Sequence, residues 1–189
     1  MAKPEQPAHT GSGAFFERRY WIDVQRPRLT IAELLDHIKC HLPDYAPGLL
    51  ADFQKTKGAA HCLALDDEFK IKILGPWNGD VRVTRVTDEG FELATLESHP
   101  EAGRIWFGLC PHAVLPDTVR FEIHSRARSR DGLVAFTYDT LGFGRRVQQQ
   151  TWEIFCQRVV ERSGGLPLLP VQVETIKQTA TDTHVSQDA

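Results

Sequence analysis

Two adjacent residues, Tyr138 and Asp139, combine a phenol and a carboxylate shortly before Gly142. A phenol can donate a proton and a carboxylate can accept one, so the pair could serve enolisation or dehydration of a carbonyl substrate. The alternative is an aspartate that faces solvent beside a tyrosine whose ring lies along the surface. We treat both as candidate catalytic residues and leave the two interpretations open.

The second polar residue that could contact a ligand is Gln148. Helical spacing places Gln148 near the centre of an apolar stripe that also contains Trp152 and Phe155. An amide buried without partners costs about 1–3 kcal/mol, so Gln148 should face either a ligand or a partner such as the backbone. We count it as a candidate ligand-binding residue.

Arg145 and Arg146 fall in the first turn of the same expected helix, where positive charge opposes the helix dipole. Gly142 and Gly144 would let an anion approach backbone N–H groups at this place. The combination suggests a site for an acidic group, but the mismatch disappears if the helix begins earlier. The role of the two arginines stays open.

Histidines and cysteines occur close together in one region, but their spacing fits no standard zinc pattern. We therefore expect no metal. No nucleophile elbow or phosphate-binding loop occurs, and we expect no cofactor. The residues concerned are His37, Cys40 and His41, with His61 and Cys62 further on.

Charge and hydropathy exclude several classes of partner. The net charge is -3, and no apolar run approaches the roughly 20 residues that span a bilayer, so we expect neither nucleic-acid binding nor membrane insertion. Residues 1–13 contain no signal-peptide core, and the four cysteines lack CxxC spacing, which predicts a cytoplasmic location with free buried thiols.

The arginine row at 120, 126, 128 and 130 is interrupted by Glu122 and is typical of a solvated sheet face. The oligomeric state is not predicted.

The order of elements predicts a single α+β domain over residues 14–171, between a disordered tail at 1–13 and a flexible tail at 172–189. Residues 15–24 alternate as a strand, and Thr30 with Glu33 forms a capping box that opens a helix ending at Pro43. A second helix is expected at 48–57. Short strands follow at 69–74, 81–87, 91–96, 103–110 and 118–128.

The chain then returns to helical periodicity, with a short helix expected at 133–141 and a long one at 143–162. Strands that follow one another so closely cannot form βαβ units. We therefore expect a curved antiparallel sheet that closes on the long carboxy-terminal helix around an apolar interior.

This order, together with the sequence GFELATLESHPEAG at 90–103, Phe107 and the run Val119 to Ile123, resembles the helix-grip fold of the START-like (SRPBCC) superfamily. That superfamily includes polyketide cyclases, plant pathogenesis-related proteins and lipid-transfer domains. The closer resemblance is to the DUF1990 proteins, through a "TLxxHPExG" turn. The resemblance covers about residues 69–162 and implies a fold, and an apolar cavity between sheet and helix, rather than an agreed catalytic set.

Large side chains from the facing elements form the candidate lining of such a cavity, although they could equally fill a solid core. The leading function is binding of a small apolar molecule. The alternatives are a cofactor-independent cyclase, dehydratase or isomerase, acting on a polyketide-like or other carbonyl substrate, and an interaction module with a filled core. The candidate ligand-binding residues are Tyr20, Phe107, Phe121, Ile123, Gln148, Trp152 and Phe155.

Overall fold

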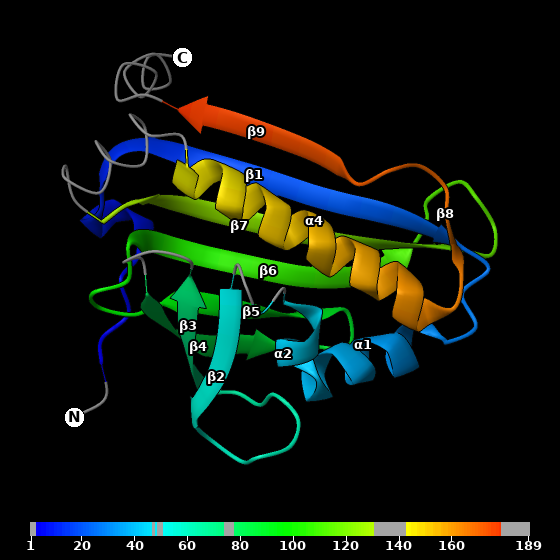
Figure 1. Cartoon of the computed structure of the whole chain (residues 1–189), viewed down its shortest axis with the longest axis horizontal. Coiled ribbons are helices and arrows are strands. Elements are labelled where there is room, and N and C mark those ends of the chain that lie inside the picture. The colour runs from blue at the N-terminus through cyan, green and yellow to red at the C-terminus, as the bar shows by residue number, and fades with distance from the viewer. Residues whose placement is uncertain (1–2, 47, 49–50, 74–77, 131–142, 179–189) are drawn as a thin grey trace, which may run out of the picture.

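An antiparallel sheet curves around the long helix α4 in this computed structural model (Figure 1). The structure describes residues 3–46, 48, 51–73, 78–130 and 143–178, with only the backbone of 51, 73 and 143–148. Its elements are η1 (Ala8–Thr10), β1 (Ser12–Gln25), α1 (Ile31–Cys40), α2 (Leu42–Tyr45), β2 (Ala51–Lys57), β3 (Glu68–Ile73), β4 (Gly79–Val86), β5 (Gly90–Thr95), β6 (Glu101–Pro111), β7 (Thr118–Ser129), α4 (Phe143–Ser163), β8 (Leu166–Pro167) and β9 (Gln172–Gln178).

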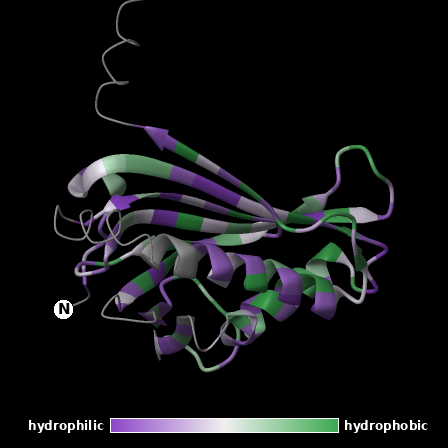
Figure 2. Cartoon of the chain, turned by 45° about the horizontal axis from the view of Figure 1, so that its top comes forward, coloured by the Kyte–Doolittle hydropathy of each residue, from purple (hydrophilic) through white to green (hydrophobic). Residues whose placement is uncertain are grey.

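Within the described residues the strand order is β2-β3-β4-β5-β6-β7-β1-β8, and β9 also pairs with β1. All of these pairings are antiparallel. Helices α1, α2 and α4 lie on one side of the sheet, as Figure 2 shows. This layering confirms the predicted α+β class and the closure of the sheet on a carboxy-terminal helix.

Local sequence signals explain where the first helix begins. The Thr30 hydroxyl accepts a hydrogen bond from the Glu33 N–H at 3.3 Å, and the Glu33 carboxylate accepts one from the Thr30 N–H at 2.8 Å. This reciprocal capping box satisfies two of the N–H groups that a helix start leaves unpaired. α1 then buries Leu34, Leu35 and Ile38.

The turn between β5 and β6 is held by residues of the TLxxHPExG sequence. The Thr95 hydroxyl donates to the Gly103 carbonyl at 3.1 Å and accepts from the Gly103 N–H at 2.9 Å. A Cβ at Gly103 would lie 2.1 Å from the carbonyl oxygen of Arg126, so only glycine fits. His99 is buried, and its Nδ1 accepts a hydrogen bond from the Glu101 N–H. These residues stabilise the hairpin.

The amino-terminal segment packs on that turn, in contrast to the disordered tail predicted for residues 1–13. The Gln6 side-chain amide donates to the carbonyls of His99 and Glu101 at 2.9 and 3.0 Å. Lys3 forms an ion pair with Asp80 at 2.6 Å. Composition marks the segment as polar but does not show that its polar groups match unpaired carbonyls of a distant turn.

Two other segments differ from expectation because tertiary pairing decides their structure. The helix predicted at 48–57 is wrong, since 51–57 forms strand β2, in which Phe53 is buried and pairs with Ile71 of β3. Residues 172–178, predicted as part of a flexible tail, form β9 along β1, although their side chains are mostly exposed. Backbone pairing leaves little trace in such a polar sequence.

Cys40 and Cys62 are joined by a disulfide, in contrast to the free thiols predicted. Twenty-two residues separate them in sequence, and the fold brings the end of α1 against the loop before β3. The Leu63 N–H donates to the Lys39 carbonyl at 2.8 Å beside them. No helix in the described part of the chain is long and apolar enough to cross a membrane.

Candidate functional site

The inner face of the sheet, which α4 covers, carries large apolar side chains in cross-strand rows. Tyr20 of β1 lies opposite Ile123 of β7, which in turn lies opposite Phe107 of β6. Phe121 occupies the next row on β7, and all four residues are buried. Alternation along each strand explains the rows, because every second side chain points to the same face. The structure thus brings these four predicted lining residues together.

Trp152 and Phe155 of α4 face this surface. The Trp152 ring packs edge-on against Phe107 with centroids 5.6 Å apart, and the Phe155 ring stacks on Phe121 at 5.6 Å. Phe155 also contacts Phe107 at 5.3 Å. These four rings form a connected set, which we call the aromatic layer: Phe107, Phe121, Trp152 and Phe155.

One polar atom in the aromatic layer is not satisfied. The indole Nε1 of Trp152 is buried and has no hydrogen-bond partner among the described residues, and Trp152 as a whole is 8% exposed. Burying an N–H group without an acceptor costs about 1–3 kcal/mol. Such an atom indicates a place where an acceptor on a ligand would be stabilising.

A charged residue that we did not predict also lies on this inner face. Arg18 is only 5% exposed, and its Nη1 donates to the Glu101 carboxylate at 3.4 Å. Its guanidinium also lies over the Phe16 ring, 4.6 Å from the centroid. The alternation that places Tyr20 on the inner face also places Arg18 there, so the sequence contains the signal.

Tyr20 has a strongly shifted acidity. Burial raises the pKa of its hydroxyl to about 12, with only partial opposition from the nearby positive charge of Arg18. The phenol therefore stays protonated near neutral pH and can donate a hydrogen bond. A second buried phenol, Tyr45 of α2, stacks on Phe155 at 5.2 Å, and burial raises its pKa to about 12 as well.

Several predicted residues lie outside the described part of the structure. Tyr138 and Asp139 belong to the segment 131–142, and the side chains of Gln148, Arg145 and Arg146 are not described. The helix predicted at 133–141 also falls there. The catalytic pair and the ligand contact of Gln148 remain predictions.

The structure has an open groove of about 550 Å³ beside α4, between this helix and the segment that leads to β9. Ile22 of β1 and Val160 of α4 contribute apolar surface, together with Leu169 and Val171 of the connecting segment. Glu153 and Glu161 line it from the helix. Ile22 lies opposite Phe121 of β7, so the groove lies next to the aromatic layer.

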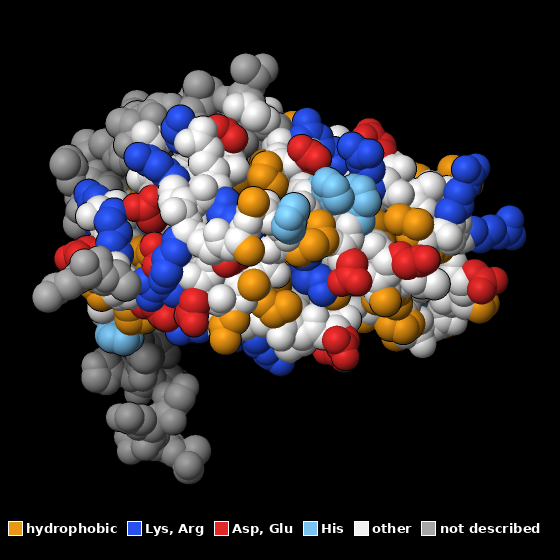
Figure 3. All heavy atoms as spheres, turned by 90° about the horizontal axis from the view of Figure 1, so that it is seen from below, with side chains coloured by type: hydrophobic (Ala, Val, Ile, Leu, Met, Phe, Trp, Pro, Cys, Tyr) orange, Lys and Arg blue, Asp and Glu red, His pale blue; other side chains and the backbone are white. Residues whose placement is uncertain are grey.

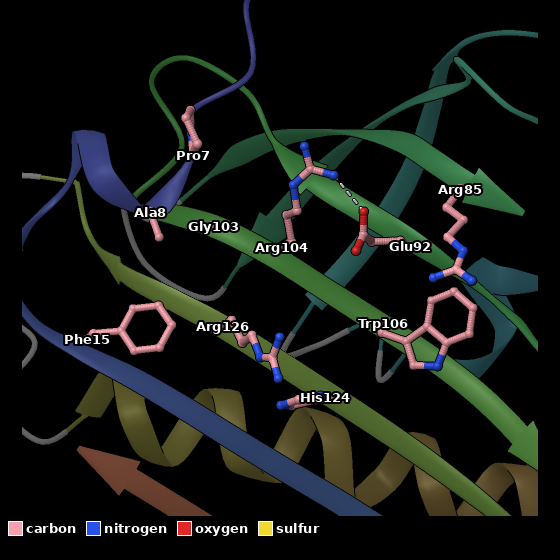
Figure 4. A pocket seen from close by; sticks show the side chains of 10 residues that line it. All are labelled: Pro7, Ala8, Phe15, Arg85, Glu92, Gly103, Arg104, Trp106, His124 and Arg126. Carbon is pink, nitrogen blue, oxygen red and sulfur yellow. Dashed lines mark hydrogen bonds and ion pairs between the residues drawn. The ribbon is translucent and has the colours of Figure 1, made fainter. Parts of the chain in front are cut away.

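A second groove, of about 520 Å³, lies on the opposite face of the sheet (Figure 4). Its charged side chains are mostly paired, since Arg104 binds Glu92 at 2.7 Å and Arg126 binds Glu17 at 3.2 Å. The Arg85 guanidinium lies over the ring of Trp106 at 5.0 Å. An aromatic ring therefore lies beside an arginine on this face, but the paired carboxylates cancel much of the positive charge that binding of a phosphate backbone would need.

Of the histidines and cysteines considered as metal ligands, His37 and Cys40 lie on α1, His41 lies between α1 and α2, and His61 and Cys62 lie in the loop before β3. Histidines gather among hydrophobic side chains on the face shown in Figure 3. The rings of His37 and His41 stack with centroids 4.3 Å apart, and Nδ1 of His37 lies 2.8 Å from the Tyr45 hydroxyl. Cys40 is held in the disulfide. The described residues contain no group of three or more possible metal ligands.

Comparison with known proteins supports the fold. No protein-family model and no curated protein matches the chain. A conserved protein from Geobacillus kaustophilus matches with a TM-score of 0.52 and 12% identity, over 78% of this chain and 95% of that one. Norcoclaurine synthase from Thalictrum flavum, solved with dopamine and hydroxybenzaldehyde, matches with a TM-score of 0.51 and 12% identity, over 79% and 89%.

A hypothetical protein from Helicobacter pylori gives a TM-score of 0.51 at 11% identity, over 77% of this chain and 86% of that one. At these identities the likeness shows the fold alone. The chain has the helix-grip fold, with an antiparallel sheet curved around a carboxy-terminal helix.

Proposed function

We propose that this protein binds a small apolar molecule between the sheet and α4, against the aromatic layer. The observation that carries the proposal is the buried Trp152 Nε1, which lacks an acceptor among the described residues and belongs to a ring that packs against Phe107 and Phe155. Apolar pockets with a few placed polar groups are the usual form of small-molecule sites. A ligand with an acceptor atom beside the indole would gain both apolar contact and this hydrogen bond.

Calorimetric titration tests the proposal with two neutral compounds, decan-1-ol and 2-(2-naphthyl)ethanol, each of which has an apolar body and one oxygen acceptor. We expect saturable binding of at least one compound to one site. Trp152→Phe keeps a ring but removes the donor, and it should weaken that binding by roughly 2- to 10-fold, the range of a net neutral hydrogen bond. The absence of saturable binding by both compounds would reject the proposal.

The alternative is a cofactor-independent cyclase, dehydratase or isomerase. Tyr20 favours it among the described residues, because its phenol, with a pKa of about 12, could donate to a substrate carbonyl from the inner face of the sheet. Norcoclaurine synthase, with the same fold, was solved with two small aromatic molecules. Conversion of a bound carbonyl compound by the wild type, abolished in Tyr20→Phe, would favour this alternative, with Tyr138 and Asp139 as further candidates.

We also infer a relationship to the DUF1990 proteins. The support is the sequence TLESHPEAG at residues 95–103, whose Thr95, His99 and Gly103 stabilise the β5–β6 turn. These roles are structural, so the relationship adds no catalytic residue to the proposal.

A further inference from the structure

Arg18 places a positive charge on the face of the sheet that α4 covers. Its side chain is 7% exposed, and the structure gives it one hydrogen bond to a described residue, from Nη1 to Glu101 at 3.4 Å. Hydrogen bonds between a guanidinium and a carboxylate are usually about 2.7–2.9 Å long. A guanidinium carries five N–H donors in a planar fork, so the Glu101 contact uses little of its capacity.

The arginines on the outer face behave differently. Arg19, the next residue of β1, donates to both carboxylate oxygens of Glu122 at 3.2 and 2.9 Å. Arg120 likewise donates to both oxygens of Asp23, at 2.7 and 2.8 Å. These pairs are fully formed although their arginine side chains are 41% and 34% exposed, whereas the Arg18 side chain is 7% exposed and makes a long contact. The N–H donors of Arg18 that do not contact Glu101 are available to a further anionic partner, which would strengthen the pairing of this charge.

Strand geometry places this charge next to the aromatic layer. Arg18 lies opposite Ser125 on β7, and Tyr20 occupies the next inner position of β1, about 7 Å further along the strand. The Tyr20 row leads through Ile123 to Phe107, which contacts Trp152. Phe107 lies two strands away from Tyr20, at about 4.8 Å per strand, so a molecule roughly 12 Å long would reach from Arg18 to the aromatic layer.

We propose that the ligand is a hydrophobic carboxylic acid whose carboxylate binds the Arg18 guanidinium while its apolar body contacts the aromatic layer. This inference rests on the proposed function and names its ligand class. A carboxylate matches the planar fork of a guanidinium with two parallel hydrogen bonds. A doubly charged phosphate is less suitable, because Glu101 already places a negative charge beside Arg18.

Calorimetric titration with matched pairs tests this assignment. Decanoate is compared with decan-1-ol, and 2-naphthylacetate with 2-(2-naphthyl)ethanol, so that each pair shares an apolar body and differs in charge. For the wild type, we expect at least one acid to bind about 10-fold or more tightly than its alcohol. Arg18→Gln should remove this preference, so that each acid binds no more tightly than its alcohol.

Two further variants make the comparison specific. Arg19→Gln removes a positive charge from the adjacent position of β1 on the outer face and should keep the preference for the acid. Arg18→Lys keeps the charge but loses the planar fork, and it should reduce the preference several-fold. If circular dichroism shows that Arg18→Gln does not fold, Arg18→Lys tests the assignment in its place. An unchanged preference of Arg18→Lys for the acid over its alcohol would then overturn the assignment.

The possible failures are distinguishable. Equal binding of acids and alcohols by the wild type would reject the carboxylate while keeping the proposed function, and Arg18 with Glu101 would then be a structural ion pair. A preference for the acid that persists in Arg18→Gln would reject Arg18 as its partner. No saturable binding of any of the four compounds would overturn the proposed function itself.

Discussion

The indole of Trp152 packs edge-on against the ring of Phe107, with centroids 5.6 Å apart and an interplanar angle of 73°. This contact joins the middle of α4 to the middle of β6, and aromatic pairs in this arrangement are favourable beyond their buried area. It also fixes the indole in the interior while its N–H lacks an acceptor among the described residues. The same side chain thus contributes to packing and offers a hydrogen bond to a ligand.

Phe121→Ala should destabilise the fold by about 3–5 kcal/mol, since the side chain is fully buried and stacks on Phe155. Urea unfolding followed by circular dichroism measures the change. Val114→Ala is the control, because Val114 is 82% exposed and its truncation should change the free energy of unfolding by less than about 0.5 kcal/mol. If Phe121→Ala lowers the free energy of unfolding by as little as Val114→Ala does, the aromatic layer is not closely packed.

His99 should make stability sensitive to mild acid. Burial holds the pKa of His99 below its usual value of 6.5, because the charged form of the ring is poorly solvated in the interior. As the pH falls, the unfolded chain therefore binds a proton at this residue before the folded protein does. The contribution of His99 to stability is complete well above pH 6.5 and is lost progressively as the pH falls through 6.5.

Urea unfolding midpoints at about pH 7.5 and pH 5.5 test this prediction, since most carboxylates stay ionised over that interval. The wild-type midpoint should fall on acidification, and the fall should be smaller in His99→Gln. An equal fall in both proteins would assign the acid sensitivity to other groups, such as His37, whose pKa burial also lowers.

Protein purified without reductant should contain the Cys40–Cys62 bond, detectable as a linked peptide pair after proteolysis. Its reduction should lower the free energy of unfolding by about 3 kcal/mol, as expected for a loop of this size. Cys62→Ser should be insensitive to reductant. A bond that is present in the native host would contradict the cytoplasmic location predicted from the sequence, because disulfides are rare in reducing compartments.

A variant that ends at Val171 loses β9, whereas one that ends at Gln178 keeps it. We expect the shorter variant to lose at least about 1 kcal/mol of stability relative to the longer one, because β1 loses the backbone hydrogen bonds of one edge. Thermal unfolding of the two variants measures the difference. Equal melting temperatures would show that β9 contributes nothing to the stability of the fold, as the polar sequence of this segment suggests.

The sequence predicts most of the central sheet because strands with one buried face alternate visibly. On β7, Phe121 and Ile123 are buried while Glu122 and Arg126 point away, as the pattern predicts. β9 could not be predicted, because an exposed edge strand is held by backbone pairing and needs no apolar face. β2 could not be predicted, because Leu49, Leu50 and Phe53 also have helical spacing. The pairing of Phe53 with Ile71, which favours a strand over a helix, is set by the tertiary structure.

The site was predictable in its apolar part and less so in its polar part. The rows through Tyr20 and Phe121 follow from period-two alternation, and Trp152 with Phe155 follows from helical periodicity. Arg18 alternates with the inner-face residues, but its neighbours at 17 and 19 are also charged, so the local pattern does not distinguish it as buried. Whether a buried arginine is paired depends on Glu101, 83 residues away in sequence, which only the fold brings close.

Tryptophan fluorescence during a titration with decan-1-ol tests the central claim most directly, because Trp152 lies on the inner face and Trp106 on the outer face of the sheet. We predict a saturable change in emission for the wild type, which Trp106→Phe keeps and Trp152→Phe largely loses while both variants stay folded. A change that Trp152→Phe keeps in full, or that Trp106→Phe loses instead, would contradict binding between the sheet and α4.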